Sequence, residues 1–289
     1  MPNHSTNQQA LPVGIAATLA VIYEVTAPKP GNVHRGADFE NVTYVDFLQS
    51  AVVIGPVLSR TAELGVGAAV LAAAQATREA VGTNTNLGTL LLIAPLAAVP
   101  DGVSHSDNIG RVLHELTLAD TRSVYEAIRI AMAGGLGQAA EADVHAAPPP
   151  DLRLVDAMLL ASARDLVARQ YCNDFADVFR IAAWIEEGMA QGWLLDTAIV
   201  HAHIRQLALE ADSLISRKCG PQVAEQAQAM AKRTIDAGLP GDEVYEFLLA
   251  DFDFWLRSDG HRRNPGTTAD LIAAALFVLL REGRLKLKR

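Results

Sequence analysis

The chain has 289 residues, of which 50% are hydrophobic and only 6% are aromatic, and its formal net charge is −9. It is long enough to bury a substantial core in one large domain or two smaller ones. The acidic balance argues against a nucleic-acid partner, since such proteins carry a basic surface. A nucleotide ligand is still allowed, provided that the cations that bind it are local.

The longest apolar runs, residues 90–100 and 271–280, fall short of the ~20 residues that cross a bilayer. The polar start of the chain also lacks the charged-then-apolar plan of a signal peptide. Cys172 and Cys219 are too few and too far apart for a disulfide framework or a zinc site. We therefore expect a cytoplasmic protein without a membrane segment, in which both cysteines are small buried side chains.

Apolar residues recur with a period of 3.6 along most of the chain, and alanine, the best helix former, is the commonest residue. This pattern predicts an all-α fold, a single large helical domain of about ten or more helices. We expect residues 1–10 to be disordered, residues 11–289 to form the helical domain, and a Pro-rich internal linker to lie near 142–150. Helices are expected at 13–25, from 43 onward, and at 66–80, 86–99, 107–118, 121–132, 152–169, 174–191, 196–217, 222–237, 242–256 and 268–281.

The first polar cluster follows the first expected helix, at residues 24–34. Pro28 and Pro30 restrict the backbone, and Gly31 allows a turn or a close approach. The loop is therefore expected to hold the polar side chains between and after the prolines in a restricted geometry that suits an anionic ligand. The alternative is an ordinary proline-stiffened helix stop.

The second cluster is the sequence Gly-Thr-Asn-Thr-Asn-Leu-Gly at residues 82–88, directly before a helix that is apolar all round. Its side chains can cap that helix, and its backbone N–H groups can bind an anion at the positive end of the helix dipole. Pro95 is expected to kink or end the helix. The cluster is not a Walker A loop, because no Gly-Lys-Ser/Thr follows at the required spacing.

Two more clusters lie in the second half of the chain. Residues 210–220 place Asp212 in an apolar stretch, two turns before the basic pair Arg217 and Lys218. Residues 261–270 open the last apolar helix, with Thr267 or Thr268 as candidate N-caps. Either cluster can bind an anion, and either can instead be a routine helix terminus or a solvated face.

In order, these clusters resemble the triphosphoribosyl-dephospho-CoA synthase family, which serves the prosthetic group of citrate lyase and malonate decarboxylase. The resemblance spans most of residues 20–280. Its specific motifs are Thr-Ala-Pro-Lys-Pro-Gly-Asn-Val at 26–33 and Asn-Pro-Gly-Thr-Thr-Ala-Asp-Leu at 264–271; weaker matches lie at 46–50, 83–88 and 212–220. The resemblance implies an all-helical enzyme that joins ATP to 3′-dephospho-CoA and releases adenine.

The same resemblance assigns roles to particular residues. Displacement at the ribose anomeric carbon builds positive charge, which a carboxylate stabilises, while a base takes the proton of the attacking hydroxyl. The triphosphate needs Mg²⁺, held by one or two carboxylates, with lysine and arginine nearby. The expected site residues are Asp212 and Asp270 as Mg²⁺ ligands or bases, His34 and Asp38 for proton transfer, Lys29, Arg217 and Lys218 for phosphates, and Asn32, Asn84 and Asn264 for the ribose or base.

One departure affects the expected substrate. The family usually has Asn-Thr-His-Lys-Gly where this chain has Asn84-Thr85-Asn86-Leu87-Gly88, so that a titratable and a cationic side chain are lost. The last motif likewise reads Gly-Thr-Thr where the family favours Gly-Gly-Ser. These differences leave open a variant nucleotide-dependent transferase in another cofactor pathway, such as one-carbon pterin metabolism.

A non-catalytic helical protein that binds a nucleotide is a further alternative. The retained carboxylates of Asp212 and Asp270 favour an enzyme, whereas the loss of the histidine and the lysine favours a protein without catalytic activity. ATP and a CoA-like acceptor are the expected small-molecule partners. An alanine-rich helix surface is also compatible with a homodimer.

Overall fold

The computed structural model describes residues 10–131 and 148–285. The start of the chain expected to be disordered and most of the expected linker at 142–150 lie outside these residues. The described residues form fifteen α-helices and no strand, which confirms the all-α prediction. The helices are α1 (Val13–Thr26), α2 (Tyr44–Leu58), α3 (Thr61–Leu64), α4 (Val66–Val81), α5 (Leu87–Ala97), α6 (His105–Glu115), α7 (Leu118–Ala131), α8 (Leu154–Ala161), α9 (Leu166–Gln170), α10 (Ala176–Ala190), α11 (Leu195–Leu209), α12 (Ser213–Cys219), α13 (Pro221–Asp236), α14 (Glu243–Arg257) and α15 (Gly266–Arg281).

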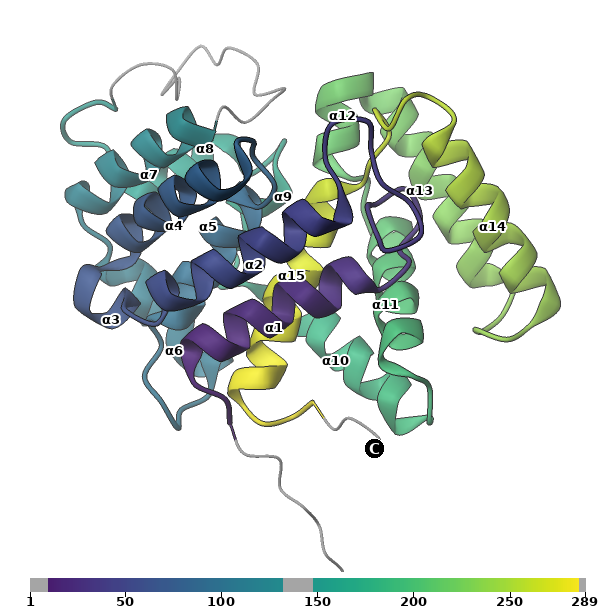
Figure 1. The fold of residues 1–289 in the computed structure, drawn as a ribbon, viewed down its shortest axis with the longest axis horizontal. Coiled ribbons are helices and arrows are strands. Elements are labelled where there is room, and N and C mark those ends of the chain that lie inside the picture. The colour runs from purple at the N-terminus through teal and green to yellow at the C-terminus, as the bar shows by residue number, and fades with distance from the viewer. Residues whose placement is uncertain (1–9, 132–147, 286–289) are drawn as a thin grey trace, which may run out of the picture.

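Helices α5 and α15 lie at the centre of the molecule (Figure 1). Both are apolar on all sides, and every residue of α15 from Leu271 to Leu280 is buried. A helix with no polar face is stable in water only when other helices surround it. Here α15 packs against α1, α5 and α10, and the layer continues from α1 through α2 and α4 to α7.

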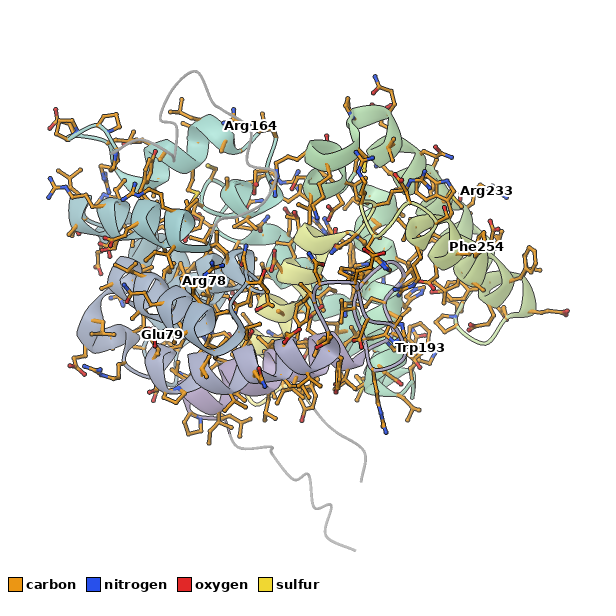
Figure 2. All side chains as sticks on the ribbon, turned by 45° about the horizontal axis from the view of Figure 1, so that its top comes forward. Arg78, Glu79, Arg164, Trp193, Arg233 and Phe254 are labelled. Carbon is orange, nitrogen blue, oxygen red and sulfur yellow. The ribbon has the colours of Figure 1, made fainter. Side chains whose placement is uncertain are left out.

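A second, smaller hydrophobic cluster joins α11, α12, α13 and α14. Its buried centre includes Phe252 and Leu256 of α14. The opposite face of α14 points away from the molecule, as Phe254 shows in Figure 2, with 74% of its surface exposed. This cluster forms the side of the molecule opposite α3, α4 and α7 (Figure 1).

The expected single helix over 196–217 is wrong, because the chain breaks between α11 and α12. Glu210 is extended, and Asp212 is the N-cap of α12, accepting hydrogen bonds from the N–H groups of Leu214 and Ile215. An aspartate favours such a cap because its short side chain satisfies N–H groups that have no partner within the helix. The expected helix over 152–169 is likewise divided into α8 and α9, with Asp165 capping α9.

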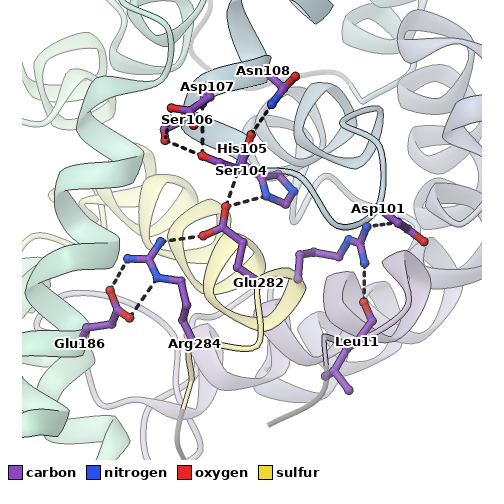
Figure 3. Close-up of polar contacts among 11 residues, drawn as sticks. Leu11, Asp101, Ser104, His105, Ser106, Asp107, Asn108, Glu186, Glu282 and Arg284 are labelled. Carbon is purple, nitrogen blue, oxygen red and sulfur yellow. Dashed lines mark hydrogen bonds and ion pairs between the residues drawn. The ribbon is translucent and has the colours of Figure 1, made fainter. Parts of the chain in front are cut away.

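The C-terminal end of α15 is fixed by a polar network (Figure 3). Glu282 accepts hydrogen bonds from the backbone and ring nitrogens of His105, at 2.9 and 3.0 Å, and pairs with Arg284. Arg284 also pairs with Glu186 of α10. The network therefore joins α6, α10 and α15 at one end of the core.

Two further expectations are settled by the fold. The two cysteines are unpaired, but the prediction that both are buried is wrong, since Cys172 is exposed and Cys219 is half-buried. Within residues 10–131 and 148–285, no helix combines the length and the apolarity needed to cross a membrane.

Candidate active site

A cavity of about 550 Å³ lies where the first and last sequence motifs meet. Its lining residues come from α1, α2, α5, α7, α8, α9, α12 and α15, from the loops that follow α1 and precede α5 and α15, and from the segment between α8 and α9. Six of the predicted site residues line it: Asn32, Asn84, Arg217, Lys218, Asn264 and Asp270. The tertiary structure therefore collects residues that are up to 238 positions apart in the chain, from 32 to 270.

Asp270 lies on the cavity surface at the start of α15, beside the start of α5. Its Oδ1 accepts a hydrogen bond of 2.6 Å from the Thr89 hydroxyl. Burial raises the pKa of Asp270 to about 7; the Thr89 hydrogen bond lowers it, while the negative charge of Glu24 raises it further. A carboxyl group with a pKa near neutrality can both accept and return a proton at physiological pH.

Gly88 creates the space that Asp270 occupies. A Cβ atom placed on Gly88 would lie 2.1 Å from Asp270 Oδ2, closer than non-bonded atoms approach. Asp270 is the fifth residue of α15, whose first residue is Gly266. The expectation that Thr267 or Thr268 caps this helix is therefore wrong, because both threonines lie inside it and Pro265 occupies the N-cap position.

Glu24 is a cavity-lining carboxylate that the sequence analysis did not assign to the site. It lies near the end of α1 and is only 6% exposed. Lys29 forms an ion pair of 2.8 Å with its Oε1 and also donates to the carbonyl oxygens of Glu24 and Ala27. The signal that could have found Glu24 is an acid on an otherwise apolar helix face, directly before the rigid loop.

The position of Lys29 differs from what a phosphate-binding role requires. Its side chain has no exposed surface and does not line the cavity. The two prolines direct the loop so that the ammonium folds back onto the end of α1, where it finds three oxygen acceptors. A buried ammonium needs such partners, because burial without them costs several kcal/mol.

Asp212 is also turned away from the cavity. Its Oδ1 caps α12, and its Oδ2 accepts from the backbone N–H and the hydroxyl of Thr268, both at 2.8 Å. Burial raises the pKa of Asp212, while these hydrogen bonds oppose the rise. The residue joins the starts of α12 and α15, which places the basic pair of α12 next to Asp270.

Arg217 and Lys218, the two predicted cations that line the cavity, differ in whether an acidic residue pairs with them. Arg217 forms an ion pair with Asp165, which also caps α9 and lines the cavity. Lys218 has no ion-pair partner among the described residues, and burial lowers the pKa of its ammonium. Arg164, labelled in Figure 2, is a further cavity-lining cation that the sequence analysis missed.

The three asparagines predicted from the sequence, Asn32, Asn84 and Asn264, line the cavity from separate loops. Asn84 uses its Oδ1 to cap α5, accepting from the N–H groups of Asn86 and Leu87 at 3.2 and 3.0 Å. In contrast, the Oδ1 atoms of Asn32 and Asn264 are buried and have no hydrogen-bond partner among the residues that the structure describes. Buried amide oxygens are nearly always paired in folded proteins, so these two atoms are available to a ligand.

His34 and Asp38 do not line the cavity. His34 Nδ1 accepts from the Gly36 N–H at 3.1 Å, and burial together with the positive charge of Arg257 lowers its pKa. Asp38 accepts from the Tyr44 N–H at 2.6 Å. Both side chains therefore order the loop between α1 and α2, and their proton-transfer roles stay predictions.

The far wall of the cavity is apolar. It is formed by α7 and α8 and includes Val124, Ile128, Leu154, Ala157, Met158 and Ala161. Leu87, where the resembling family has lysine, lines the cavity, and so does Asn86, whose Nδ2 donates to Thr77 Oγ1 at 3.2 Å. The cavity lining thus combines cations and amides with an apolar wall.

No metal-binding group is preformed in the described part of the chain. Across residues 10–131 and 148–285, no three His, Cys, Asp or Glu side chains are arranged to bind a metal ion. Of the two predicted Mg²⁺ ligands, Asp270 reaches the cavity and Asp212 does not. A metal ion at this site would therefore need ligands from a substrate.

Comparison with known proteins gives a consistent result. A sequence model of the ATP:dephospho-CoA triphosphoribosyl transferase family matches residues 11–289. A crystal structure from Archaeoglobus fulgidus, provisionally described as a triphosphoribosyl-dephospho-CoA synthase, has the same fold: the TM-score is 0.63 at 24% identity, over 82% of this chain and all of that one. A search of curated protein sequences finds no significant match.

The fold is all-helical, with a cavity of small-molecule size beside its central helices, and the family match makes the protein a transferase. Because the match covers nearly the whole chain, the protein belongs to the ATP:dephospho-CoA triphosphoribosyl transferase family.

Proposed function

We propose that this protein transfers the triphosphoribosyl unit of ATP to a hydroxyl group of 3′-dephospho-CoA and releases adenine. The observation that carries the proposal is the position of Asp270, a half-buried carboxyl group on the surface of a cavity that both cations and apolar side chains line. The cations suit the triphosphate, and the apolar wall suits the neutral tail of a CoA-like acceptor.

The phosphates are expected to bind Arg217 and Lys218 of α12, beside the start of α9. Lys218 brings a charge that no described residue neutralises, while Arg217 is held in place by Asp165. The N-termini of α5 and α15 also point their positive dipole ends at the cavity. The unpaired amide oxygens of Asn32 and Asn264 are suited to accept from ribose hydroxyls or from the adenine amino group.

Asp270 is assigned the role of base. The attacking hydroxyl loses its proton as its oxygen bonds to the anomeric carbon, and a carboxylate with a pKa near 7 matches that task. Thr89 fixes the orientation of the carboxylate through Oδ1 and leaves Oδ2 toward Gly88.

Mg²⁺ is expected to enter with ATP. The ion prefers six oxygen ligands and is held in nucleotide enzymes mainly by phosphates and water, with one or two carboxylates. A single contribution from Asp270 is compatible with that pattern, whereas Asp212 has no oxygen free to reach the ion. When bound, Mg²⁺ would neutralise the charge of the triphosphate.

A variant acceptor is the second candidate, and Leu87 is the observation that favours it. A leucine at the cavity surface, where the family usually has lysine, cannot bind a phosphate or a carboxylate. The acceptor of this protein would then carry an uncharged group at that point, as a pterin-like ring would.

Incubation with ATP, Mg²⁺ and 3′-dephospho-CoA tests the proposal. Adenine release, with a triphosphoribosyl adduct of matching mass, is the expected result. Adenine release only with a different acceptor would support the variant transferase. ATP binding without consumption under either condition would support the non-catalytic alternative and overturn the proposal.

A further inference from the structure

We propose that Glu24 is a further catalytic residue, whose carboxylate faces the ribose ring and stabilises the positive charge that develops there, and that Lys29 positions it. The inference deepens the proposed function and rests on it. It gives Lys29 a positioning role in place of the phosphate-binding role expected from the sequence.

The first observation is that Glu24 combines burial with access to the cavity. It is 6% exposed, yet it is part of the cavity surface, next to the loop that carries Asn32. Its Oε1 forms the ion pair with Lys29, whereas its Oε2 accepts no hydrogen bond from the described residues. The free oxygen is therefore the one available to a ligand.

The second observation is the rigidity of the support. The Lys29 ammonium is fully buried and has three oxygen acceptors, all within residues 24–27. Pro28 and Pro30 flank it and remove backbone freedom on both sides. A carboxylate held this way keeps one orientation, which electrostatic stabilisation of a transition state requires.

The third observation concerns energetics. A buried ion pair is weak evidence for stability, because an apolar pair of similar volume is often equally stable or more so. Placing one at a cavity surface is better explained by a need for a fixed negative charge there. Glu24 is also close enough to Asp270 for its negative charge to raise the pKa of that residue, so both carboxylates can contact the same ligand in the cavity.

The two carboxylates differ in what surrounds them. Glu24 has a cation at 2.8 Å, whereas the Asp270 side chain, among the described residues, is hydrogen-bonded only to the Thr89 hydroxyl. In enzymes with two such groups, the paired one stays ionised and the unpaired one exchanges protons. The structure therefore assigns the fixed charge to Glu24 and the proton transfer to Asp270.

The resulting step balances. The bond between the ribose anomeric carbon and adenine N9 breaks, and its electron pair leaves with adenine. The acceptor oxygen forms the new bond to the same carbon, and its proton passes to Asp270 and from there, through water, to adenine. Glu24 forms no bond and lowers the energy of the cationic ring between the two events.

A pair of ligands tests the inference without turnover. One is a pyrrolidine analogue of ribose 5-triphosphate, called the cationic ligand because its ring nitrogen is protonated. The other, called the neutral ligand, has an uncharged cyclopentane ring in its place and carries the same triphosphate. Calorimetry on the wild type and on the double variant E24Q/K29M, which removes both charges together, compares the two. We expect the double variant to bind the cationic ligand at least about tenfold more weakly and the neutral ligand within about twofold.

Two further variants complete the test. E24D keeps the charge but withdraws it by one methylene, so the cationic ligand should again lose affinity in a chain that retains the ion pair; this variant decides the question if the double variant fails to fold. E79Q, on the exposed surface of α4, is the matched control and should bind both ligands as the wild type does.

The outcomes separate the inference from the proposed function. Equal losses for both ligands, or no loss for either, would overturn the role of Glu24. A wild-type protein that discriminates between the ligands but releases no adenine from ATP and 3′-dephospho-CoA would retain the role of Glu24 and contradict the proposed acceptor.

Discussion

Gly88 and Asp270 are complementary in shape: a Cβ atom on Gly88 would lie 2.1 Å from Asp270 Oδ2 and 2.6 Å from its Cγ. Two helices from distant parts of the chain thus meet at a point where one residue has no side chain and the other carries the candidate base. This contact gives a reason for the glycine that ends the second polar cluster.

The variant G88A should therefore lose activity. The added methyl group must displace the Asp270 carboxylate, and we expect adenine release to fall by about 100-fold while the free energy of unfolding falls by about 1–3 kcal/mol. The control is G110A in α6, where the nearest heavy atom would be Asp174 Oδ1 at 3.2 Å. Full activity in G88A would contradict the position of Asp270 in the site.

Replacing Asp270 by asparagine should remove the base with little change in shape. We expect kcat for adenine release to fall by about 10²–10⁴-fold, with ATP affinity within a few-fold of the wild type. Single-turnover kinetics and calorimetry measure the two quantities. An unchanged kcat would assign proton transfer to another residue.

Replacing Asp212 should lower the stability of the fold rather than remove a catalytic group. Alanine at this position removes two N-cap hydrogen bonds and two buried bonds to Thr268. We expect the free energy of unfolding to fall by about 2–4 kcal/mol, measured by urea denaturation. A stable but inactive D212A protein would instead support the predicted metal or base role.

Lys218 should contribute to ATP affinity. Because its ammonium has no ion-pair partner among the described residues, K218M should raise the Kd for ATP by about 10-fold and weaken the dependence of Kd on salt. R262A is the matched control, since Arg262 is exposed and donates to the Lys218 carbonyl oxygen without lining the cavity. Equal effects in the two variants would argue against a specific phosphate contact.

The network around Glu282 should make stability depend on acid pH. Burial on its own raises the pKa of Glu282, but hydrogen bonds from His105 and Arg284 outweigh it and lower the pKa from 4.5 to about 2 (Figure 3). Because the pKa is lowered in the folded state, ionised Glu282 contributes fully to the free energy of unfolding above pH 4.5, and this contribution is lost as the pH falls toward 2.

E282Q should remove this dependence and cost about 1–2 kcal/mol at neutral pH, after allowance for partial exposure of the group. Thermal unfolding between pH 2 and pH 7 measures both effects. Parallel curves for the wild type and the variant would contradict the assignment.

Much of the local structure follows from the sequence. The helix expected from residue 43 onward is α2, which Thr43 caps in a capping box with Asp46. The apolar run after residue 86 forms the buried helix α5, with Pro95 close to its end. These features depend on neighbouring residues and on periodicity, which the sequence contains in full. The breaks at residues 162–165 and 210–212 were missed, because a cap inside a helical pattern looks like an ordinary polar residue.

The site divides in the same way. The four polar clusters predicted the polar segments of the cavity but not its apolar wall from α7 and α8, and six of the ten predicted site residues line it. Only the tertiary structure decided which side chains face inward: Lys29 turns back to Glu24, and Asp212 turns to Thr268. The reason is physical, since a loop side chain goes to whichever partner satisfies its charge, and here those partners become available only after the chain folds.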